Sequence, residues 1–251
     1  MFTINKEDKI FKAHIMDKHK ECYDRDYHTV TRFLNLNEQT VVMQMKNEFR
    51  VPFKLWGGFD DAERKILCFL PSWADDNLSD FLKIVKVSHS GRKTLSHRDY
   101  LGSLLSIGIS RDAVGDIWVS EYYAHIIVKS EMADFIKMNY DKAGRVSLFG
   151  EILGIENISV PLYNIKEVKD TVSSLRLDAV VASAFSMSRG NAAEHISAGN
   201  VYVNDMLTTK TDFKVSEGSK IKVHRRGRAI LKEIGGLSRK DRIFVTFDLY
   251  M

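Results

Sequence analysis

The sequence lacks any long hydrophobic run. No stretch approaches the roughly 18 consecutive apolar residues that a membrane helix needs. The first residues, MFTINKEDKIFKAH, carry charges where a secretory signal peptide would have its apolar core. Both absences predict a cytoplasmic protein with no membrane partner.

Cysteine and nucleotide-binding motifs are also scarce. The two cysteines, Cys22 and Cys68, are far apart and outside any CxxC, which argues against a disulfide framework and a Cys-rich zinc site. The histidines lack the HExxH spacing of a zinc site. The glycines form neither GxGxxG nor GxxxxGK[ST]. We therefore expect no metal, no cofactor and no small-molecule substrate.

Positive charge is concentrated near the C-terminus. Residues 175–251 hold 13 Lys+Arg and 8 Asp+Glu, a net charge of +5. The rest of the chain holds 37−13=24 basic and 33−8=25 acidic residues, a net charge of −1. Such an asymmetry is typical of a protein in which one domain meets a polyanion.

The apolar pattern predicts an α+β protein with three domains. Residues 1–75 form a mixed α/β domain, with amphipathic helices over 5–19 and 37–49 and a hairpin over 51–71. Residues 76–165 follow the order strand, helix, strand, strand, helix, strand, which is the split βαβ plan of ferredoxin-like domains. Ser96 is the expected N-cap of the first helix in that domain.

The last predicted domain, 174–251, follows a connecting stretch over 153–174. Two short helices are expected at 176–185 and 189–199, the second capped by Ser188 and ended by Gly199. Paired strands follow in VYVND and EGSKIKVHRRGR.

This domain carries the candidate RNA-binding residues. A helix N-terminus presents free N–H groups and partial positive charge to a phosphate, and arginine suits forked phosphate contacts and stacking on unpaired bases. We expect the basic residues from 220 to 242 to form one cationic strip beside the start of the second helix. The predicted RNA-binding residues are Arg176, Ser188, Arg189, Asn191, His195, Lys220, Lys222, Arg225, Arg226, Arg228, Arg239, Lys240 and Arg242.

The motifs RLD, SRGNAAEHISAGNVYVND and EGSKIKV resemble the S4 domain, or alpha-L RNA-binding motif. Ser219 and Asp205 stand where the motif usually has Asp and Gly, which affects turns and leaves the basic positions intact. WGGFDDAERKILCFLP and HRDYLGSLLSIGISRDAVGDI extend a similarity to the YlmH family of bacterial RNA-binding proteins over nearly the whole chain. That family usually reads close to Arg-Gly-Lys-Gly-Arg where this chain has His-Arg-Arg-Gly-Arg at 224–228.

The resemblance implies a non-enzymatic factor that binds ribosomal RNA on the large ribosomal subunit, with peptidyl-tRNA as a further candidate, and that assists rescue of stalled ribosomes. The alternatives are an RNA-modifying enzyme targeted by the S4 domain and a cell-division accessory protein. The chain lacks the cofactor turn of a methyltransferase and the catalytic body of a synthase or a synthetase.

Two features outside the last domain have competing interpretations. His97, Arg98 and Asp99 are read first as a helix start capped by Ser96 and Asp99, second as accessory RNA contacts together with Arg111, and last as a catalytic pair. Aromatic residues on the middle sheet are expected in the core rather than stacked on bases. These aromatic residues are Phe81, Tyr122, Tyr123 and Phe149.

Overall fold

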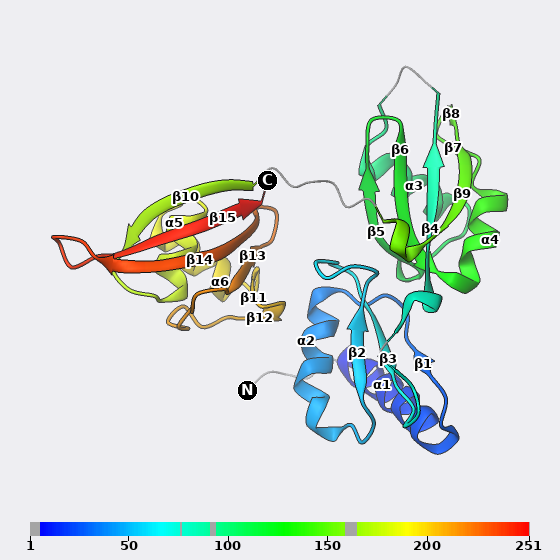
Figure 1. Ribbon diagram of the computed structural model, residues 1–251, viewed down its shortest axis with the longest axis horizontal. Coiled ribbons are helices and arrows are strands. Elements are labelled where there is room, and N and C mark those ends of the chain that lie inside the picture. The colour runs from blue at the N-terminus through cyan, green and yellow to red at the C-terminus, as the bar shows by residue number, and fades with distance from the viewer. Residues whose placement is uncertain (1–5, 76, 91–93, 159–164, 251) are drawn as a thin grey trace. The chain divides into compact units, whose positions relative to one another are not determined.

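The computed structural model describes residues 6–75, 77–90, 94–158 and 165–250. Its contacts divide the chain into two compact units, Met1–Pro161 and Leu162–Met251 (Figure 1). Both units combine helices and strands, which confirms the α+β class. Asn5 and residues 159–164, which belong to a predicted helix and to the predicted connecting stretch, lie outside the described residues.

The first part of unit 1 is a small sheet with two helices. Its β2–β3 pair is antiparallel, as the sequence predicts, and β1 pairs with the other side of β3. A capping box between Asn35 and Glu38 begins α2. The elements are α1 (Lys6–Arg25), β1 (Thr29–Val30), α2 (Leu36–Met45), η1 (Lys46–Glu48), β2 (Phe53–Trp56) and β3 (Ile66–Phe69).

The second part of unit 1 is the predicted ferredoxin-like domain. Its four main strands lie in the order β5-β6-β4-β9 with antiparallel neighbours, so β6 lies between β4 and β5 as the split βαβ plan requires. The elements are η2 (Ser79–Phe81), β4 (Leu82–Ser88), α3 (His97–Ser106), η3 (Arg111–Ala113), β5 (Val114–Val119), β6 (Tyr123–Lys129), α4 (Ser130–Asn139), β7 (Lys142–Ala143), β8 (Val146–Ser147), β9 (Phe149–Gly154) and η4 (Ile155–Asn157).

A shared apolar cluster joins the two parts of unit 1. Phe33 and Ile66 of the first part are buried in one cluster with Ile84 and Ile127 of the ferredoxin-like sheet. Gly115 permits this approach, because a Cβ at that position would lie 2.7 Å from the Phe33 ring. The two parts therefore share buried surface.

Arg64 adds polar contacts to this junction. Its guanidinium donates hydrogen bonds to the carbonyls of Phe33, Arg111 and Val114 at 3.1 to 3.4 Å. The Asp116 carboxylate accepts from the backbone N–H groups of Glu63 and Arg64 at 2.6 and 3.1 Å. Two of the sequence stretches that carry the YlmH resemblance therefore meet here, and their charged residues hold the junction together.

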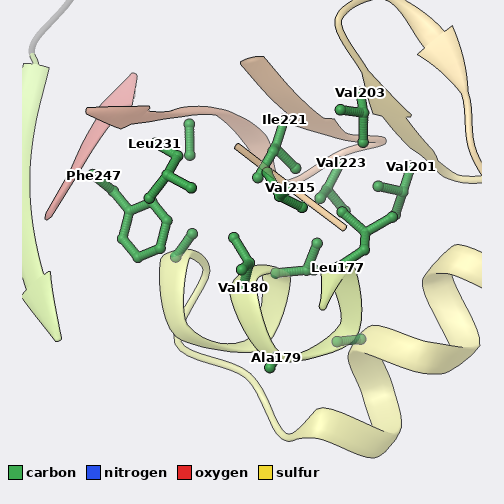
Figure 2. Packing of buried hydrophobic residues seen from close by; sticks show 14 of the residues in the cluster. Leu177, Ala179, Val180, Val201, Val203, Val215, Ile221, Val223, Leu231 and Phe247 are labelled. Carbon is green, nitrogen blue, oxygen red and sulfur yellow. The ribbon is translucent and has the colours of Figure 1, made fainter. Parts of the chain in front are cut away.

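Unit 2 packs two short helices against one face of a curved sheet (Figures 1 and 2). Its strand order is β10-β15-β14-β13-β11-β12. Figure 2 shows Leu177 and Val180 of α5 facing Ile221, Val223 and other apolar residues of the strands. The elements are β10 (Ile165–Val172), α5 (Leu177–Ala184), α6 (Arg189–Ser197), β11 (Val201–Val203), β12 (Met206–Leu207), β13 (Lys220–Val223), β14 (Gly227–Leu237) and β15 (Ile243–Tyr250).

Two features of unit 2 differ from the sequence prediction. Residues 165–172 are not a connecting stretch but the edge strand β10, which pairs with β15 along its whole length. The alternation of polar and apolar residues in β10 is weak, because most of its side chains are exposed, so the apolar pattern does not reveal the strand. The long β14–β15 hairpin is the second feature that the apolar pattern does not predict.

No helix among the described residues is both long and apolar enough to cross a membrane.

Candidate functional site

The centre of the candidate site is one buried carboxylate that binds two arginines. Asp178, in the first turn of α5, is 6% exposed. It accepts a pair of hydrogen bonds from Arg176 and another pair from Arg189, all at 3.1 to 3.2 Å. Forked contacts of this kind fix both the position and the plane of a guanidinium. We call these three residues the Asp178 cluster.

The Asp178 cluster remains charged and open to solvent on its arginine side. Burial would raise the pKa of Asp178, but the hydrogen bonds from Arg176 and Arg189 outweigh it and hold that pKa below its ordinary value. The arginine side chains are 40% and 51% exposed. Two cations around one anion leave a net charge of +1 and exposed guanidinium groups for an outside anion.

The start of α6 lies next to this cluster in the chain. Ser188 is the N-cap as predicted, and its hydroxyl accepts from the Asn191 N–H at 3.2 Å. Ser188, Arg189 and Gly190 are exposed. Because the first N–H groups of a helix have no intrahelical acceptor, this turn offers backbone donors beside two arginines. Asn191 is exposed at the same end.

The turn between β13 and β14 lies at the other end of α6. The His224 N–H donates to the Asn200 carbonyl at 2.9 Å, and the Asn200 N–H donates to the carbonyl of His195 in the last turn of α6. Arg225 and Arg226 in this turn are exposed. The prediction that the basic strip lies beside the start of α6 is therefore wrong for these residues, because β13 pairs with β11, which follows α6.

Arg225 adopts a backbone conformation that favours glycine. Its φ is +61°, and Arg225 stands where the YlmH resemblance usually has Gly. Asn204 and Asp205 also have positive φ, at 51° and 63°, so the β11–β12 turn keeps its shape although Asp205 replaces Gly. Gly199 ends α6 with a φ of +75°, as predicted.

Three predicted cations lie on the face of the sheet opposite the helices. Lys220 and Lys222 alternate along β13 with the buried Ile221 and Val223, so the lysines project away from the core. Lys220 lies 3.8 Å from Asp205. Lys222 is half-buried and pairs across the sheet with Arg228.

Arg228 is largely withdrawn from solvent. It is 8% exposed, and its guanidinium carbon lies 4.0 Å from the centre of the Tyr250 ring. This stacking follows from register, because Arg228 and Tyr250 are direct cross-strand partners. Arg228 is one of the predicted RNA-binding residues, and a direct RNA contact does not fit this burial.

The last three predicted cations form a separate group. Arg239, Lys240 and Arg242 are exposed around the β14–β15 turn. Arg242 is held there by donating to the Thr171 hydroxyl at 2.9 Å and to the Thr171 carbonyl. Since β14 separates this turn from the β13–β14 turn by about 30 Å at ~3.3 Å per residue, the predicted single strip is in fact two groups.

Two of the candidate accessory residues in unit 1 are exposed, and the third is hydrogen-bonded within its own domain. His97 and Arg98 are exposed in the first turn of α3, which begins with the predicted capping box of Ser96 and Asp99. Arg111 is half-buried and donates to the carbonyls of Val114 and Gly115 at 2.6 and 3.2 Å. Burial, and then the nearby Arg64, lower the pKa of Arg111 to about 10. Arg111 therefore holds backbone carbonyls of its own domain, and its role as an accessory RNA contact stays a prediction.

Comparisons with known proteins show the family to which this chain belongs. The chain is 33% identical over 221 residues to a Bacillus subtilis (strain 168) protein named ribosome-associated protein quality control protein P2, and the match covers 87% of this chain and 86% of the relative. Residues 78–157 match the family model described as "Putative RNA-binding domain in YlmH". This chain belongs to the YlmH family.

A solved structure of the YlmH family has a similar fold. It is described as cell division protein ylmH from Streptococcus pneumoniae, with 20% sequence identity and a TM-score of 0.53. The match covers 63% of this chain and 99% of that one. At this level of identity the likeness concerns the fold alone.

The residues that match the YlmH family model include four aromatic residues that the sequence predicts to lie in the core. Tyr122 and Phe149 are 57% and 64% exposed, so that assignment is wrong for both. Phe81 and Tyr123 are half-buried. Alternation along β6 and β9 alone does not reveal which face of the sheet is covered.

Within the described residues, no group of three or more His, Cys, Asp and Glu side chains is placed to hold a metal ion.

Proposed function

We propose that this chain is a non-enzymatic RNA-binding factor of ribosome-associated quality control. On this proposal, unit 2 contacts ribosomal RNA, and also tRNA, on the large ribosomal subunit. The observation that carries the proposal is the Asp178 cluster beside the start of α6, which presents two oriented guanidinium groups and free helix N–H groups to one anion. The printed name of the Bacillus relative supports the ribosome as the partner.

The two ends of α6 make this surface fit a nucleic-acid backbone better than a single anion. Arg189 begins α6, and the turn that holds Arg225 and Arg226 lies at its other end. A helix of nine residues spans about 13 Å at ~1.5 Å per residue, which accommodates successive phosphates of one strand. The cations of the β14–β15 turn lie too far along β14 to belong to the same contact.

Sedimentation of a lysate through a sucrose gradient, with RNA crosslinked to the tagged protein, tests the proposal. We expect the protein to migrate with the large subunit and to crosslink to its RNA or to tRNA. Combining Arg189→Ala with Arg226→Ala should shift the protein to the top fractions. The purified variant should also show an RNA affinity that depends less steeply on salt, with the logarithmic slope reduced by about 2 because two phosphate contacts are lost.

The control removes two cations outside the proposed surface. Lys137 and Lys142 are exposed in unit 1, so Lys137→Ala combined with Lys142→Ala changes the net charge equally. We expect this control to sediment as the wild type does. Loss of sedimentation in both double variants would mean that net charge alone drives binding, and its retention in both would mean that the RNA-binding surface lies elsewhere. Wild-type protein remaining at the top would refute the ribosome as partner. New modified nucleosides in the bound RNA would instead indicate an enzyme.

A further inference from the structure

One face of the ferredoxin-like sheet is covered only in part. The face toward α3 and α4 buries Val85, Val87, Ile126 and Val128 in an apolar core. On the opposite face, the first part of unit 1 covers the end of the sheet near Ile84. The other end of that face, where β4 ends and β6 begins, carries aromatic residues.

Cross-strand register arranges these residues in two rows. In the first row, Ser88 of β4 pairs with Phe149 of β9 and with Tyr123 of β6. In the second row, Lys86 pairs with Glu151 of β9 and with His125 of β6, and His125 pairs with Trp118 of β5. Directly paired residues of an antiparallel sheet share one face, so both rows lie on the face opposite the helices. We call these two rows the aromatic face.

Two rings of the aromatic face, Tyr123 and His125, lie close together, and Phe149 is open to solvent. Phe149 is 64% exposed. The Tyr123 and His125 ring centres are 5.1 Å apart, and Lys86 Nζ lies 5.4 Å from the Tyr123 ring centre. Trp118 is supported from the first part of unit 1 by Phe59, with ring centres 5.4 Å apart. The face thus combines supported rings with Lys86, whose Nζ lies 3.9 Å from Glu151 Oε2.

His125 adds an unused polar atom to this face. It is 4% exposed, and its Nδ1 has no hydrogen-bond partner among the described residues. A buried ring nitrogen without a partner is costly unless a ligand supplies one. Burial, and then Lys86, lower the pKa of His125, which keeps its ring neutral at neutral pH.

We propose that the aromatic face binds unpaired bases of single-stranded RNA, with Phe149 and Tyr123 stacking on bases and Lys86 contacting the backbone. Every base has a π face that can stack on an aromatic side chain, and lysine supplies the charge that a phosphate requires. Four-stranded RNA-binding sheets stack bases on aromatic residues of one face, and here Tyr123 lies on the inner strand β6 and Phe149 on the edge strand β9.

Two further observations favour RNA over a docked protein. Lys86 and Glu151 lie in the middle of the face, whereas the core of a protein interface is depleted of charged residues. Phe149 and Tyr123 are also separated by two strand spacings of ~4.8 Å, which leaves about 10 Å for separate bases. The proposal shares RNA as the partner with the proposed function, but it uses different residues in the other unit.

A short oligouridine that carries 4-thiouridine and a fluorescent label tests the proposal on the full chain. To silence the surface of unit 2, the protein also carries Arg189→Ala and Arg226→Ala. We expect photocrosslinks on peptides of β6 and β9. Phe149→Ala should weaken binding about tenfold in fluorescence anisotropy, because one stacked base is lost. Since Phe149 is exposed, this change should leave the fold intact.

Matched variants separate stacking from other effects. Phe135 of α4 is 46% exposed on the helix side of the same domain, so Phe135→Ala should leave binding unchanged. Phe149→Trp should preserve binding, and Phe149→Leu should weaken it as Phe149→Ala does. Wild-type affinity in Phe149→Leu, or crosslinks confined to unit 2, would overturn the proposal and favour a protein partner for this face. Those results would leave the ribosome sedimentation of the wild type, and so the proposed function, untouched.

Discussion

Asp178 is the residue on which the candidate site of unit 2 depends. It lies in the first turn of α5, yet it also holds Arg189 of α6, so one carboxylate orients cations from two helices. Its Oδ1 also accepts from the Ala179 N–H at 2.9 Å. Because all these donors converge on one buried group, the arginines reach solvent with fixed planes rather than as flexible side chains.

Asp178→Asn should therefore destabilise the protein. The amide keeps the shape but loses the charge and turns N–H donors toward two guanidinium groups. We expect the free energy of unfolding to fall by about 1–3 kcal/mol at pH 7, measured by urea denaturation. Asp241→Asn is the control, since Asp241 is exposed in a turn with a φ of +54° that asparagine also tolerates. Equal stability of both variants would contradict the role given to Asp178.

The difference in unfolding free energy between the wild type and Asp178→Asn should also depend on pH. The folded pKa of Asp178 lies below its ordinary value of 3.8 because the arginine hydrogen bonds outweigh the opposing effect of burial. A carboxyl group whose pKa is lower in the folded than in the unfolded state stabilises the folded protein. This stabilisation is fully present above the pKa of the unfolded state and is lost as pH falls through the pKa of the folded state. The stability difference between wild type and Asp178→Asn should thus be constant above about pH 5 and shrink below pH 3.8.

At the scale of elements, α6 is the helix that presents the site. Its first turn supplies Arg189 and exposed N–H groups, and its last turn lies beside the β13–β14 turn. Ser188 determines where this helix begins, because its hydroxyl satisfies one of the free N–H groups. A stable first turn is needed for the donors to act together.

Ser188→Ala should lower the free energy of unfolding by about 1 kcal/mol, because the Asn191 N–H loses its acceptor. RNA binding should weaken as the first turn of α6 frays. The matched control is Ser197→Ala, a serine exposed at the last residue of the same helix. Urea denaturation and RNA anisotropy measure both effects. If the two serine changes had equal consequences, the cap would not be what positions the site.

At the scale of the whole molecule, the described contacts define two units, and the strand β10 decides where the second begins. It forms eight cross-strand pairs with β15, from Ile165 with Tyr250 to Val172 with Ile243. Val172 is 2% exposed in the core of unit 2. A domain that starts at 174, as the sequence predicts, would lack this strand and leave β15 as an exposed edge.

Fragments 162–251 and 174–251 should therefore differ in stability. We expect the longer fragment to unfold cooperatively in urea and to elute as a monomer in size-exclusion chromatography. The shorter one should unfold at lower urea concentration and self-associate, because it loses the packing of Val172 and exposes strand-pairing groups. Equal stability would support the boundary at 174, and the three-domain division as a whole stays a prediction.

The sequence by itself determined the α+β class, the split βαβ order, both helices of unit 2, the start of α6 at Ser188 and its end at Gly199, and the YlmH family. The class, the strand order and the helix ends follow from local signals, namely apolar periodicity, caps and glycine conformation, which neighbouring residues express without long-range contacts. The family follows instead from the resemblance of long motifs such as HRDYLGSLLSIGISRDAVGDI. The roles of the predicted RNA-binding residues stay predictions.

Only the tertiary structure decided which residues share a surface. Strand pairing carried Arg225 to the far end of α6, placed Arg239 about 30 Å away along β14, and stacked Arg228 on Tyr250. Coverage of only part of one sheet face left Phe149 exposed. A side-chain pattern gives the period of a strand but not what packs on each face, because that depends on segments distant in the chain.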